Sequence, residues 1–255
     1  MKKLLINGIG GQMGHALMKA VSDADSGFEI VCGVDPFCKT ALPFPVYASA
    51  SDVSEPVDAV IDFSVPKATE EILVFCLRTK TPAVICTTAL SDELIAKISE
   101  ASKQIPVFRS GNMSLGVNLM RVLLKQARQT LGDAFDIEIV ETHHNRKKDA
   151  PSGTALMLAD AIREADGTDH PYVFGRSEKD RRREPGEIGF HSIRGGTIVG
   201  QHEVRFLGQD EEISIRHEAY SKQVFASGAL KAAAFLLTKQ NGLFTMEDLV
   251  SELLH

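Results

Sequence analysis

One polar stretch of the chain combines the side chains that proton transfer and anion binding require. It runs from Glu141 to Ala155 and reads Glu-Thr-His-His-Asn-Arg-Lys-Lys-Asp-Ala-Pro-Ser-Gly-Thr-Ala. When a hydride is added to a conjugated double bond, the carbanion-like end needs a proton from a nearby general acid. His143 and Lys147 are the candidates for that acid, and Lys147 and Lys148 add positive charge that suits an anionic substrate.

The end of this stretch predicts a binding site for a carboxylate. Ser152-Gly153-Thr154 precedes an amphipathic run from Ala155 to Ala165, so its backbone N–H groups lie at a helix start, where anions bind. The alternative is that Asp149 to Thr154 only caps the helix. A metal site at His143 and His144 is disfavoured, because the two neighbouring lysines would repel a cation.

His143 and His144 are not expected to play the same part. If residues 141–144 are extended, successive side chains point to opposite faces of the strand. Only one of the two histidines then faces the reacting centre, and the other either binds the substrate or supports the surrounding structure.

A second motif, near the start of the chain, predicts a nucleotide-binding turn. A strand-like run, Leu4 to Ile9, leads into glycines at 8, 11 and 14, and a helical pattern follows. The strict G-x-G-x-x-G form fails because position 13 is Met, but glycines still let the backbone approach a pyrophosphate at a helix N-terminus. A purely structural tight turn is the alternative.

Asp35 follows the next predicted strand, Glu29 to Val34, about 20 residues after the glycines, where dinucleotide-binding folds place an acid on the ribose. An acid there favours NADH over NADPH, because it repels a 2′-phosphate. Lys39 is near enough in sequence to leave NADPH possible. Since Pro36 comes next, Asp35 could instead be only a turn residue at the strand end.

Three further apolar runs, Asp58 to Phe63, Ala83 to Thr88 and Pro106 to Phe108, alternate with helical segments. This alternation predicts an α/β fold with a Rossmann-like doubly wound parallel sheet. Ligands bind at the carboxyl ends of such strands. Thr87, Thr88 and Asn112 follow two of these ends, where they could line a nicotinamide site or serve only as turn residues.

The pattern changes after a predicted long helix, Leu115 to Leu131. Short strand-like runs follow at 135–140, 172–174, 188–193, 197–207 and 212–218, and Arg194-Gly195-Gly196 between two of them is typical of a hairpin turn. We therefore expect an α+β substrate domain with an open, mostly antiparallel sheet. The predicted domains are 1–113 and 114–223, with the helices of 224–255 packing back on the first.

Composition narrows the function classes. The net charge is −6 and the pI is about 5.8, which argues against a nucleic-acid binder. The first apolar run is too short for a signal peptide and no run is long enough to span a membrane, so a cytoplasmic location is expected. No cysteine pair shows C-x-x-C or zinc spacing, so no metal site is expected.

The sequence from Glu141 to Ala155 resembles the signature of the 4-hydroxy-tetrahydrodipicolinate reductase (dihydrodipicolinate reductase) family of bacterial lysine and diaminopimelate biosynthesis. The resemblance extends over nearly the whole chain. It includes Gly8 to Gly14, Ile61 to Phe63, Asn112 to Asn118, Pro185 to Phe190, Gly200 to His202 and Gly242 to Phe244.

The resemblance implies roles for particular residues. His143 matches the proton donor and acceptor, Lys147 the second catalytic donor, and His144 a substrate contact. Gly153 and Thr154 match the pair whose backbone binds a substrate carboxylate. The residues that match cofactor contacts are Gly8, Ile9, Gly10, Gly11, Gln12, Met13, Asp35, Cys86, Thr87, Thr88, Ser110, Gly111, Asn112 and Met113. The family also implies a homotetramer built largely through the sheet of the substrate domain.

The chain departs from the family pattern in ways that bear on cofactor choice. Asp35-Pro36 stands where many members have Glu-Arg, and Val65 stands where some have Arg. Both changes remove possible partners of a 2′-phosphate, so NADH is expected to be preferred or at least equal. Cys86 and Met113 stand where Gly and Phe are common.

The resulting prediction is an NAD(P)H-dependent oxidoreductase that reduces a cyclic dicarboxylate, 4-hydroxy-tetrahydrodipicolinate, to tetrahydrodipicolinate. The alternative is a sensor that binds NAD(H) without catalysis. A semialdehyde dehydrogenase on the same fold is disfavoured, because it would use a nucleophilic cysteine and none of the four cysteines lies in residues 114–223.

Overall fold

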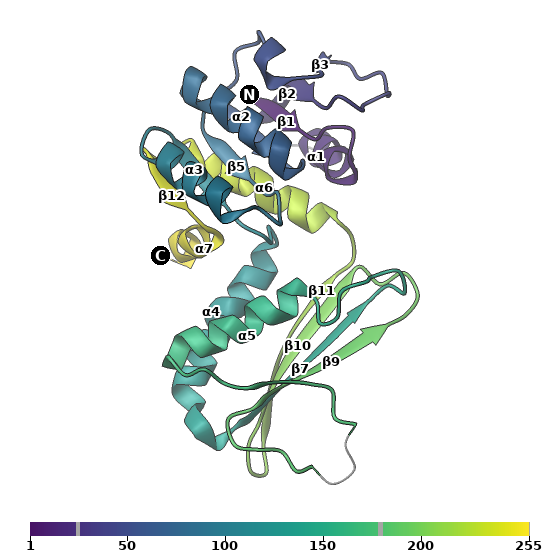
Figure 1. Cartoon of the computed structure of the whole chain (residues 1–255), viewed down its shortest axis with the longest axis vertical. Helices are drawn as coiled ribbons and strands as arrows, with labels where there is room; N and C mark the ends of the chain where they lie inside the picture. The colour runs from purple at the N-terminus through teal and green to yellow at the C-terminus, as the bar shows by residue number, and fades with distance from the viewer. Residues whose placement is uncertain (24–25, 178–180, 255) are drawn as a thin grey trace. The chain divides into compact units, whose positions relative to one another are not determined.

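The computed structural model describes residues 1–23, 26–177 and 181–254. The chain forms two compact units, each with its own sheet and its own core (Figure 1). Unit 1 consists of Met1–Leu115 and Lys222–His255, and unit 2 of Gly116–Ser221. Within the described ranges, no helix is both long and apolar enough to cross a membrane.

Unit 1 is a parallel sheet of seven strands in the order β12-β6-β5-β4-β1-β2-β3, which confirms the predicted doubly wound fold. Its elements are β1 (Lys2–Asn7), α1 (Gln12–Ser22), β2 (Phe28–Val34), β3 (Val46–Tyr47), a 3₁₀ turn (Ala50–Asp52), β4 (Ala59–Asp62), α2 (Pro66–Thr79), β5 (Ala83–Ile85), α3 (Asp92–Ser102), β6 (Pro106–Arg109), α6 (Gln223–Leu236), β12 (Gly242–Phe244) and α7 (Met246–Leu254). The edge strands β3 and β12 were not predicted, because two or three residues are too few to show a hydrophobic period.

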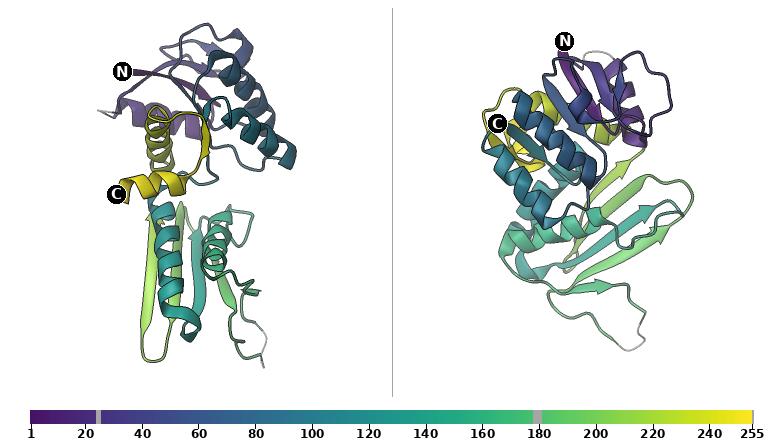
Figure 2. Two further views of the ribbon diagram at one scale, coloured as in Figure 1. Left: turned by 90° about the vertical axis from the view of Figure 1, so that its left-hand side faces the viewer. Right: turned by 45° about the horizontal axis from the view of Figure 1, so that its top comes forward.

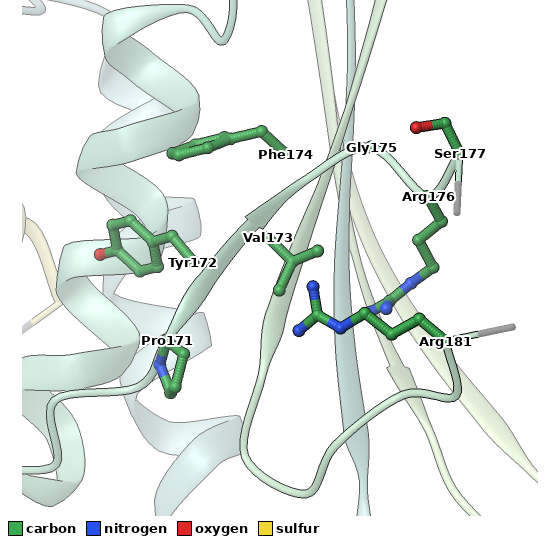
Figure 3. Close-up of a pocket in the computed structure, with 8 residues that line it drawn as sticks. All are labelled: Pro171, Tyr172, Val173, Phe174, Gly175, Arg176, Ser177 and Arg181. Atoms are coloured by element: carbon green, nitrogen blue, oxygen red, sulfur yellow. The ribbon is translucent and has the colours of Figure 1, made fainter. Parts of the chain in front are cut away.

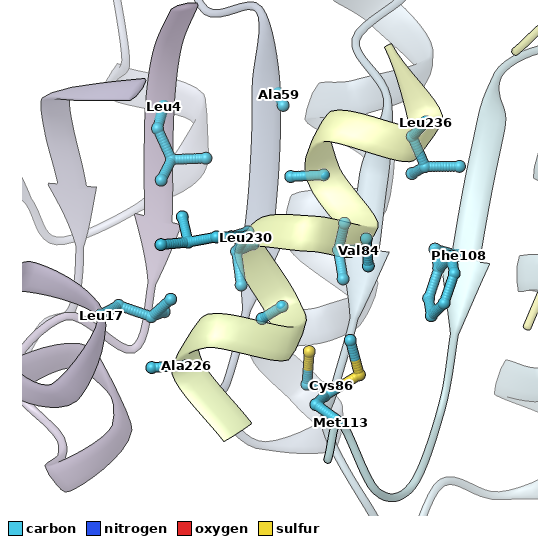
Figure 4. Close-up of a cluster of buried hydrophobic side chains, with 14 of the residues drawn as sticks. Leu4, Leu17, Ala59, Val84, Cys86, Phe108, Met113, Ala226, Leu230 and Leu236 are labelled. Carbon is cyan, nitrogen blue, oxygen red and sulfur yellow. The ribbon is translucent and has the colours of Figure 1, made fainter. Parts of the chain in front are cut away.

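Alternating side chains of the strands divide the core of unit 1 into two layers. Leu4 and Ile6 face one side of the sheet, where they pack with α1, α6 and α7. Leu5 faces the other side, with α2 and α3. Figure 4 shows α6 lying across the first layer, and Figure 2 shows this late segment, in yellow, among elements from the start of the chain. Both faces of the strands are therefore buried, as their near-continuous apolar sequences require.

Helix α6 fits closely against the sheet because its inner face is made of small residues. Ala226, Ala229 and Ala233 are fully buried. Gly228 lies so close to the backbone of Met113 that a Cβ atom added there would be 1.7 Å from the Met113 carbonyl oxygen. The contact joins the C-terminal segment to the end of the first part of unit 1.

Unit 2 is a five-stranded sheet in the order β11-β10-β7-β9-β8. Its elements are α4 (Leu115–Leu131), a 3₁₀ turn (Gly132–Ala134), β7 (Asp136–His143), α5 (Gly153–Asp166), β8 (Tyr172–Phe174), β9 (Ile188–Arg194), β10 (Gly200–Leu207) and β11 (Glu212–Ala219). The expectation of a mostly antiparallel sheet is wrong in part. β10 pairs antiparallel with β7 and β11, but β9 pairs parallel with β7 and β8, so the sheet is mixed.

The predicted hairpin at Arg194-Gly195-Gly196 is also wrong. β7 lies between β9 and β10 and pairs with both, so these two strands do not pair with each other. The connecting loop instead crosses the end of β7, where Gly195 N–H donates to the His143 carbonyl and Asn145 N–H donates to the Gly196 carbonyl. The turn residues were recognised, but a local turn signal does not determine which strand lies alongside.

Helices α4 and α5 cover one face of this sheet (Figures 1 and 2). Leu124 of α4 and Leu158 and Ile162 of α5 pack on inward side chains of β7, β9 and β10. Because β7 alternates strictly, with residues 137, 139, 141 and 143 buried, Glu141 and His143 lie on the helix-covered face. The packing of β7 thus brings two polar side chains onto the buried side of the sheet.

We predict that Gly228→Ala lowers the free energy of unfolding of unit 1. Overpacking typically costs about 1–3 kcal/mol, and a clash with a backbone carbonyl leaves little room to relax, so it should outweigh the ~1 kcal/mol that alanine adds to helix propensity. Denaturant unfolding measures the change. Lys231→Ala, at an exposed position of the same helix, is the control and should change stability by less than about 0.5 kcal/mol. Equal stability of the two variants would contradict the close contact.

Candidate active site

The register of the sheet in unit 2 places several polar side chains beside one another. Glu141 of β7 lies opposite Ser192 of β9 and opposite His202 of β10. Two residues further along β7, on the same face, His143 lies opposite Arg194 of β9. Three strands therefore contribute to one cluster, although the residues of β7 are about 50 to 60 positions away in sequence from those of β9 and β10.

The Glu141 carboxylate is the centre of this cluster. Its side chain is 1% exposed and accepts two hydrogen bonds from the Arg194 guanidinium, at 2.6 and 2.8 Å. It also contacts the His143 ring at 2.6 Å and accepts from the Ser152 backbone N–H at 3.2 Å. Burial alone would raise the pKa of this carboxyl, but the hydrogen bonds from Arg194, Ser192 and His143 outweigh it and hold the pKa at about 2. Glu141 is therefore a buried anion at neutral pH.

This anion orients His143. A carboxylate can only accept, so the hydrogen bond at Nδ1 assigns the ring proton of the neutral form to Nδ1 and leaves Nε2 as the nitrogen that can exchange a proton. Nε2 lies above Gly200, where an added Cβ would come within 3.0 Å of it. Burial lowers the pKa of His143; Glu141 opposes this shift, whereas Lys147 and Arg194 add to it.

Ser152 connects the cluster to helix α5. Its Oγ accepts the Ala155 N–H at 3.1 Å, which caps the helix, and lies 2.8 Å from Nε2 of His202. Burial lowers the pKa of His202 to about 3. His202 is thus neutral near pH 7, and its Nε2 shares a hydrogen bond with the Ser152 hydroxyl. The His143 and His202 rings meet edge to face, with centroids 5.1 Å apart.

The remaining predicted residues of unit 2 lie in the loop after β7 and at the start of α5. Lys147 Nζ forms an ion pair with Asp149 at 2.8 Å, and the Lys147 backbone N–H donates to the His144 carbonyl. His144 is half-buried, and its backbone N–H donates to the Ile198 carbonyl. Gly153 and Thr154 are the first two residues of α5. The side chains of Ser152 and Glu141 thus hold in place the turn that contains Gly153 and Thr154.

Unit 1 holds the second group of predicted residues. Gly8, Ile9, Gly10, Gly11, Gln12 and Met13 form the turn between β1 and the first residues of α1. Gly8 has φ +83°, and an added Cβ there would be 2.7 Å from the Phe63 carbonyl oxygen; at Gly14 it would be 2.2 Å from that of Ile9. Gly11, at the N-cap of α1, offers no side-chain cap. These features fit a turn that carries a pyrophosphate on the backbone N–H groups of a helix start.

Asp35 lies directly against this turn. Its carboxylate accepts the Gly10 N–H at 3.0 Å and the Phe37 N–H at 2.9 Å. A side chain at position 10 would come within 2.9 Å of the same carboxylate. A carboxylate has about four acceptor sites, so Asp35 keeps capacity for ribose hydroxyls after both backbone bonds.

A buried carboxylate, Asp62, holds the strand ends of unit 1 together. It is fully buried and accepts hydrogen bonds from Asn7 at 2.9 Å, Thr69 at 2.6 Å and Thr87 at 2.9 Å, as well as from Ser64. Burial raises its pKa, and the hydrogen bonds from Ser64, Thr69 and Thr87 oppose the rise. The Thr87 hydroxyl, predicted to contact a cofactor, is thus directed to Asp62.

The other predicted residues of unit 1 lie after β5 and β6. Thr88 is exposed, and Ser110 Oγ accepts the Asn112 N–H at 3.2 Å across the turn that contains Gly111. Cys86 and Met113 are buried in the core beside α6 (Figure 4), so their side chains contribute mainly packing. All of these residues lie at the carboxyl ends of parallel strands.

A hollow of about 320 Å³ lies elsewhere, beside β8 (Figure 3). Its two arginines are already neutralised: Arg176 pairs with Glu138 and Glu187, and Arg181 pairs with Glu187. None of the predicted site residues lines it. The hollow therefore offers no strong attraction to a dicarboxylate.

The residues of these clusters that were not predicted as site residues include Arg194, His202, Asp62 and Asn7. Arg194 was assigned to a hairpin turn, so its approach to Glu141 could not be foreseen. His202 and Asp62 stand in segments that resemble the family, which was the available signal. No local pattern marks Asn7, because it resembles any residue at the end of an apolar strand.

Comparison with known proteins gives one family for the whole chain. Residues 2–113 match the family model described as "Dihydrodipicolinate reductase, N-terminus", and residues 116–250 match "Dihydrodipicolinate reductase, C-terminus". The 4-hydroxy-tetrahydrodipicolinate reductase of Caldanaerobacter subterraneus subsp. tengcongensis is 50% identical over 254 residues, 99% of each chain. That of Clostridium novyi is 43% identical over 250 residues, 98% of each chain. A dipicolinate-bound dihydrodipicolinate reductase from Paenisporosarcina sp. TG-14 shares the fold, with a TM-score of 0.81 at 24% identity over 97% of this chain and 99% of its own.

We predict that the free energy of unfolding falls on acidification below about pH 6.5, and that His202→Gln weakens this dependence. The folded-state pKa of His202 is about 3, below the ~6.5 of an unfolded histidine. The unfolded state therefore binds the extra proton between these values, and stability is lost as the pH falls through that window at up to ~1.4 kcal/mol per unit. Glutamine can still form a hydrogen bond with Ser152 but does not titrate. Unfolding free energies of both proteins at several pH values test this, and identical slopes would contradict a buried neutral His202.

Proposed function

The chain belongs to the dihydrodipicolinate reductase family, and from that membership we propose that it catalyses the NAD(P)H-dependent reduction of 4-hydroxy-tetrahydrodipicolinate to tetrahydrodipicolinate. The observation that carries the proposal is the cluster around His143 in a chain 50% identical to a reductase of that name over its whole length. A reduced nicotinamide, when bound, supplies the hydride. The chain's own residues bind the substrate and deliver the proton.

We assign the proton to Nε2 of His143. Glu141 occupies Nδ1, so Nε2 is the position from which the ring can give a proton and take it back. Lys147 assists as a second donor and attracts the substrate anion. His144 contacts the substrate, and the backbone of Gly153 and Thr154 at the start of α5 binds one of its carboxylates.

We assign the nucleotide to the turn from Gly8 to Met13, with Asp35 on the adenosine ribose. Cys86, Thr87 and Thr88 and the turn from Ser110 to Met113 form the nicotinamide end. Since Cys86 and Met113 are buried and the Thr87 hydroxyl is bonded to Asp62, we infer that these three contribute backbone groups or packing. We also infer a homotetramer, as in the family that the chain resembles.

The test of the function is steady-state oxidation of NADH and NADPH, with the substrate generated in situ from pyruvate and aspartate semialdehyde by the preceding enzyme. Turnover supports the reductase. Binding of NADH by a folded protein without turnover would favour the sensor instead.

We predict that His143→Ala lowers kcat by about 10²–10⁴-fold, the usual contribution of a general acid, and leaves the KM for the cofactor nearly unchanged. Lys147→Ala should lower kcat and also raise the KM for the substrate, because it removes a positive charge from an anion site. Arg146→Ala, at an exposed position one residue earlier, controls for loss of charge in the loop. Near-normal turnover in both the His143 and the Lys147 variant would rule out these roles.

We predict that kcat/KM for NADH equals or exceeds that for NADPH. The Asp35 carboxylate repels a 2′-phosphate, and ~1 kcal/mol of repulsion between charges separated by water corresponds to roughly a fivefold difference. Asp35→Asn removes the charge and should shift the ratio towards NADPH by about that factor. If the unaltered protein instead has a clearly lower KM for NADPH at matched kcat, the assignment is wrong and Lys39 becomes the residue to replace.

A further inference from the structure

Glu141 begins the central stretch, and the function proposed so far assigns it no contact with substrate or cofactor. It neither donates a proton at its pKa of about 2 nor lies exposed to a substrate, since only 1% of its side chain is accessible. Yet four of its contacts join separate parts of unit 2. These are His143 on the same strand, both nitrogens of the Arg194 fork on β9, and the Ser152 N–H at the start of α5.

We propose that Glu141 and Arg194 are positioning residues that select Nε2 of His143 as the proton-exchanging atom and tie that atom to the carboxylate-binding turn. The inference rests on the proposed function, because it gives His143 its proton-transfer role. The inference goes beyond the proposed function because it gives a positioning role to two residues, Glu141 and Arg194, for which that function assigns no contact with substrate or cofactor.

The first step is the choice of nitrogen. A ring that is free to rotate or to change tautomer could present either Nδ1 or Nε2. The contact of 2.6 Å with a group that only accepts fixes the proton on Nδ1. Gly200 then leaves room beside Nε2, since even a methyl group there would approach it to 3.0 Å.

The second step is the state of Glu141 itself. A buried carboxylate without a cation would take up a proton rather than stay charged. The two bonds from Arg194 keep it ionised, and the same guanidinium also donates to the Asp149 carbonyl at 2.8 Å. Arg194 thus anchors the loop that carries Lys147 while it holds the charge of Glu141.

The third step is the coupling to substrate binding. One oxygen of Glu141 contacts the His143 ring, and the other accepts the Ser152 N–H. Ser152 is the N-cap of α5, and the next two residues, Gly153 and Thr154, open the helix. One carboxylate group therefore sets both the proton donor and the turn that binds the substrate anion.

The charged and titratable groups that face His143 come from every surrounding element. They are Glu141 on β7, Arg194 on β9, His202 on β10, and Lys147 with its partner Asp149 in the loop. Of these, Glu141 alone raises the pKa of His143, while Arg194 and Lys147 lower it and neutral His202 adds no charge. Removing the charge of Glu141 should therefore lower the pKa of His143.

The test is Glu141→Gln, a change of the same shape that removes the negative charge. Imidazole NMR of protein labelled with ¹⁵N-histidine, with the His143 signals identified by their loss in His143→Gln, gives the tautomer and the pKa without any need for turnover. We expect the pKa of His143 to fall by about one unit or more and the Nδ1–H preference to weaken. In the pH profile of kcat, the limb that reports the loss of the proton from His143 should move to lower pH by the same amount.

The matched control is Glu138→Gln. Glu138 lies on the opposite face of the same strand and also holds a histidine and an arginine, His191 at 2.7 Å and Arg176 at 2.8 Å. The Glu138→Gln variant should leave the tautomer of His143, the pKa of His143 and the pH profile of kcat unchanged. If Glu138→Gln moves them as far as Glu141→Gln does, the effect is general and the proposal fails.

A second variant covers the case in which Glu141→Gln does not fold, because it leaves Arg194 as a buried charge without its partner. Glu141→Gln with Arg194→Gln removes both charges and should shift the pKa in the same direction by a smaller amount. A folded variant whose His143 keeps its tautomer and pKa overturns the proposal. The proposed function fails separately, if the unaltered protein shows the NMR behaviour expected of His143 but no turnover.

Discussion

The charge of Glu141 is the constraint on which the site in unit 2 depends. A carboxylate removed from water must find donors for its lone pairs, and its cost without them exceeds the gain from any single contact. Arg194, Ser192, His143 and the Ser152 N–H meet that need together. Because they come from two strands and a helix start, satisfying one charge also fixes the order β9-β7, the loop after β7 and the first turn of α5.

Unit 1 also contains a buried carboxylate that needs hydrogen-bond donors, but there the donors are neutral groups. Asp62 is buried at the end of β4 and accepts from Asn7, Thr69 and Thr87, hydroxyl or amide groups without a balancing cation. Burial accordingly raises the pKa of Asp62, whereas Arg194 keeps that of Glu141 low. A carboxyl that only holds strand ends tolerates partial protonation, whereas one that must orient a histidine benefits from a fixed charge.

The sequence predicts those features that depend on local pattern. Helix α4 begins and ends at the expected residues, Leu115 and Leu131, because the spacing of its apolar residues defines it. The glycine-rich turn from Gly8 to Met13 and the polar stretch from Glu141 to Thr154 were recognisable for the same reason. The hairpin at Arg194 was not predicted correctly, since the placement of β7 between β9 and β10 depends on contacts over 50 residues away. Arg194 and His202 join the site only through that placement.

The interrupted course of unit 1 along the chain has a consequence for its synthesis. Strands β1 to β6 are complete by residue 109, but α6, which covers one face of their sheet, begins only at Gln223. Unit 2 lies between them in the sequence and is continuous. During translation the apolar residues of that face, Leu4 and Ile6 among them, leave the ribosome more than 100 residues before their cover. Unit 2 is thus the first unit whose chain is complete, and until α6 is made, α1 is the only described helix of this layer available to cover that face of the sheet.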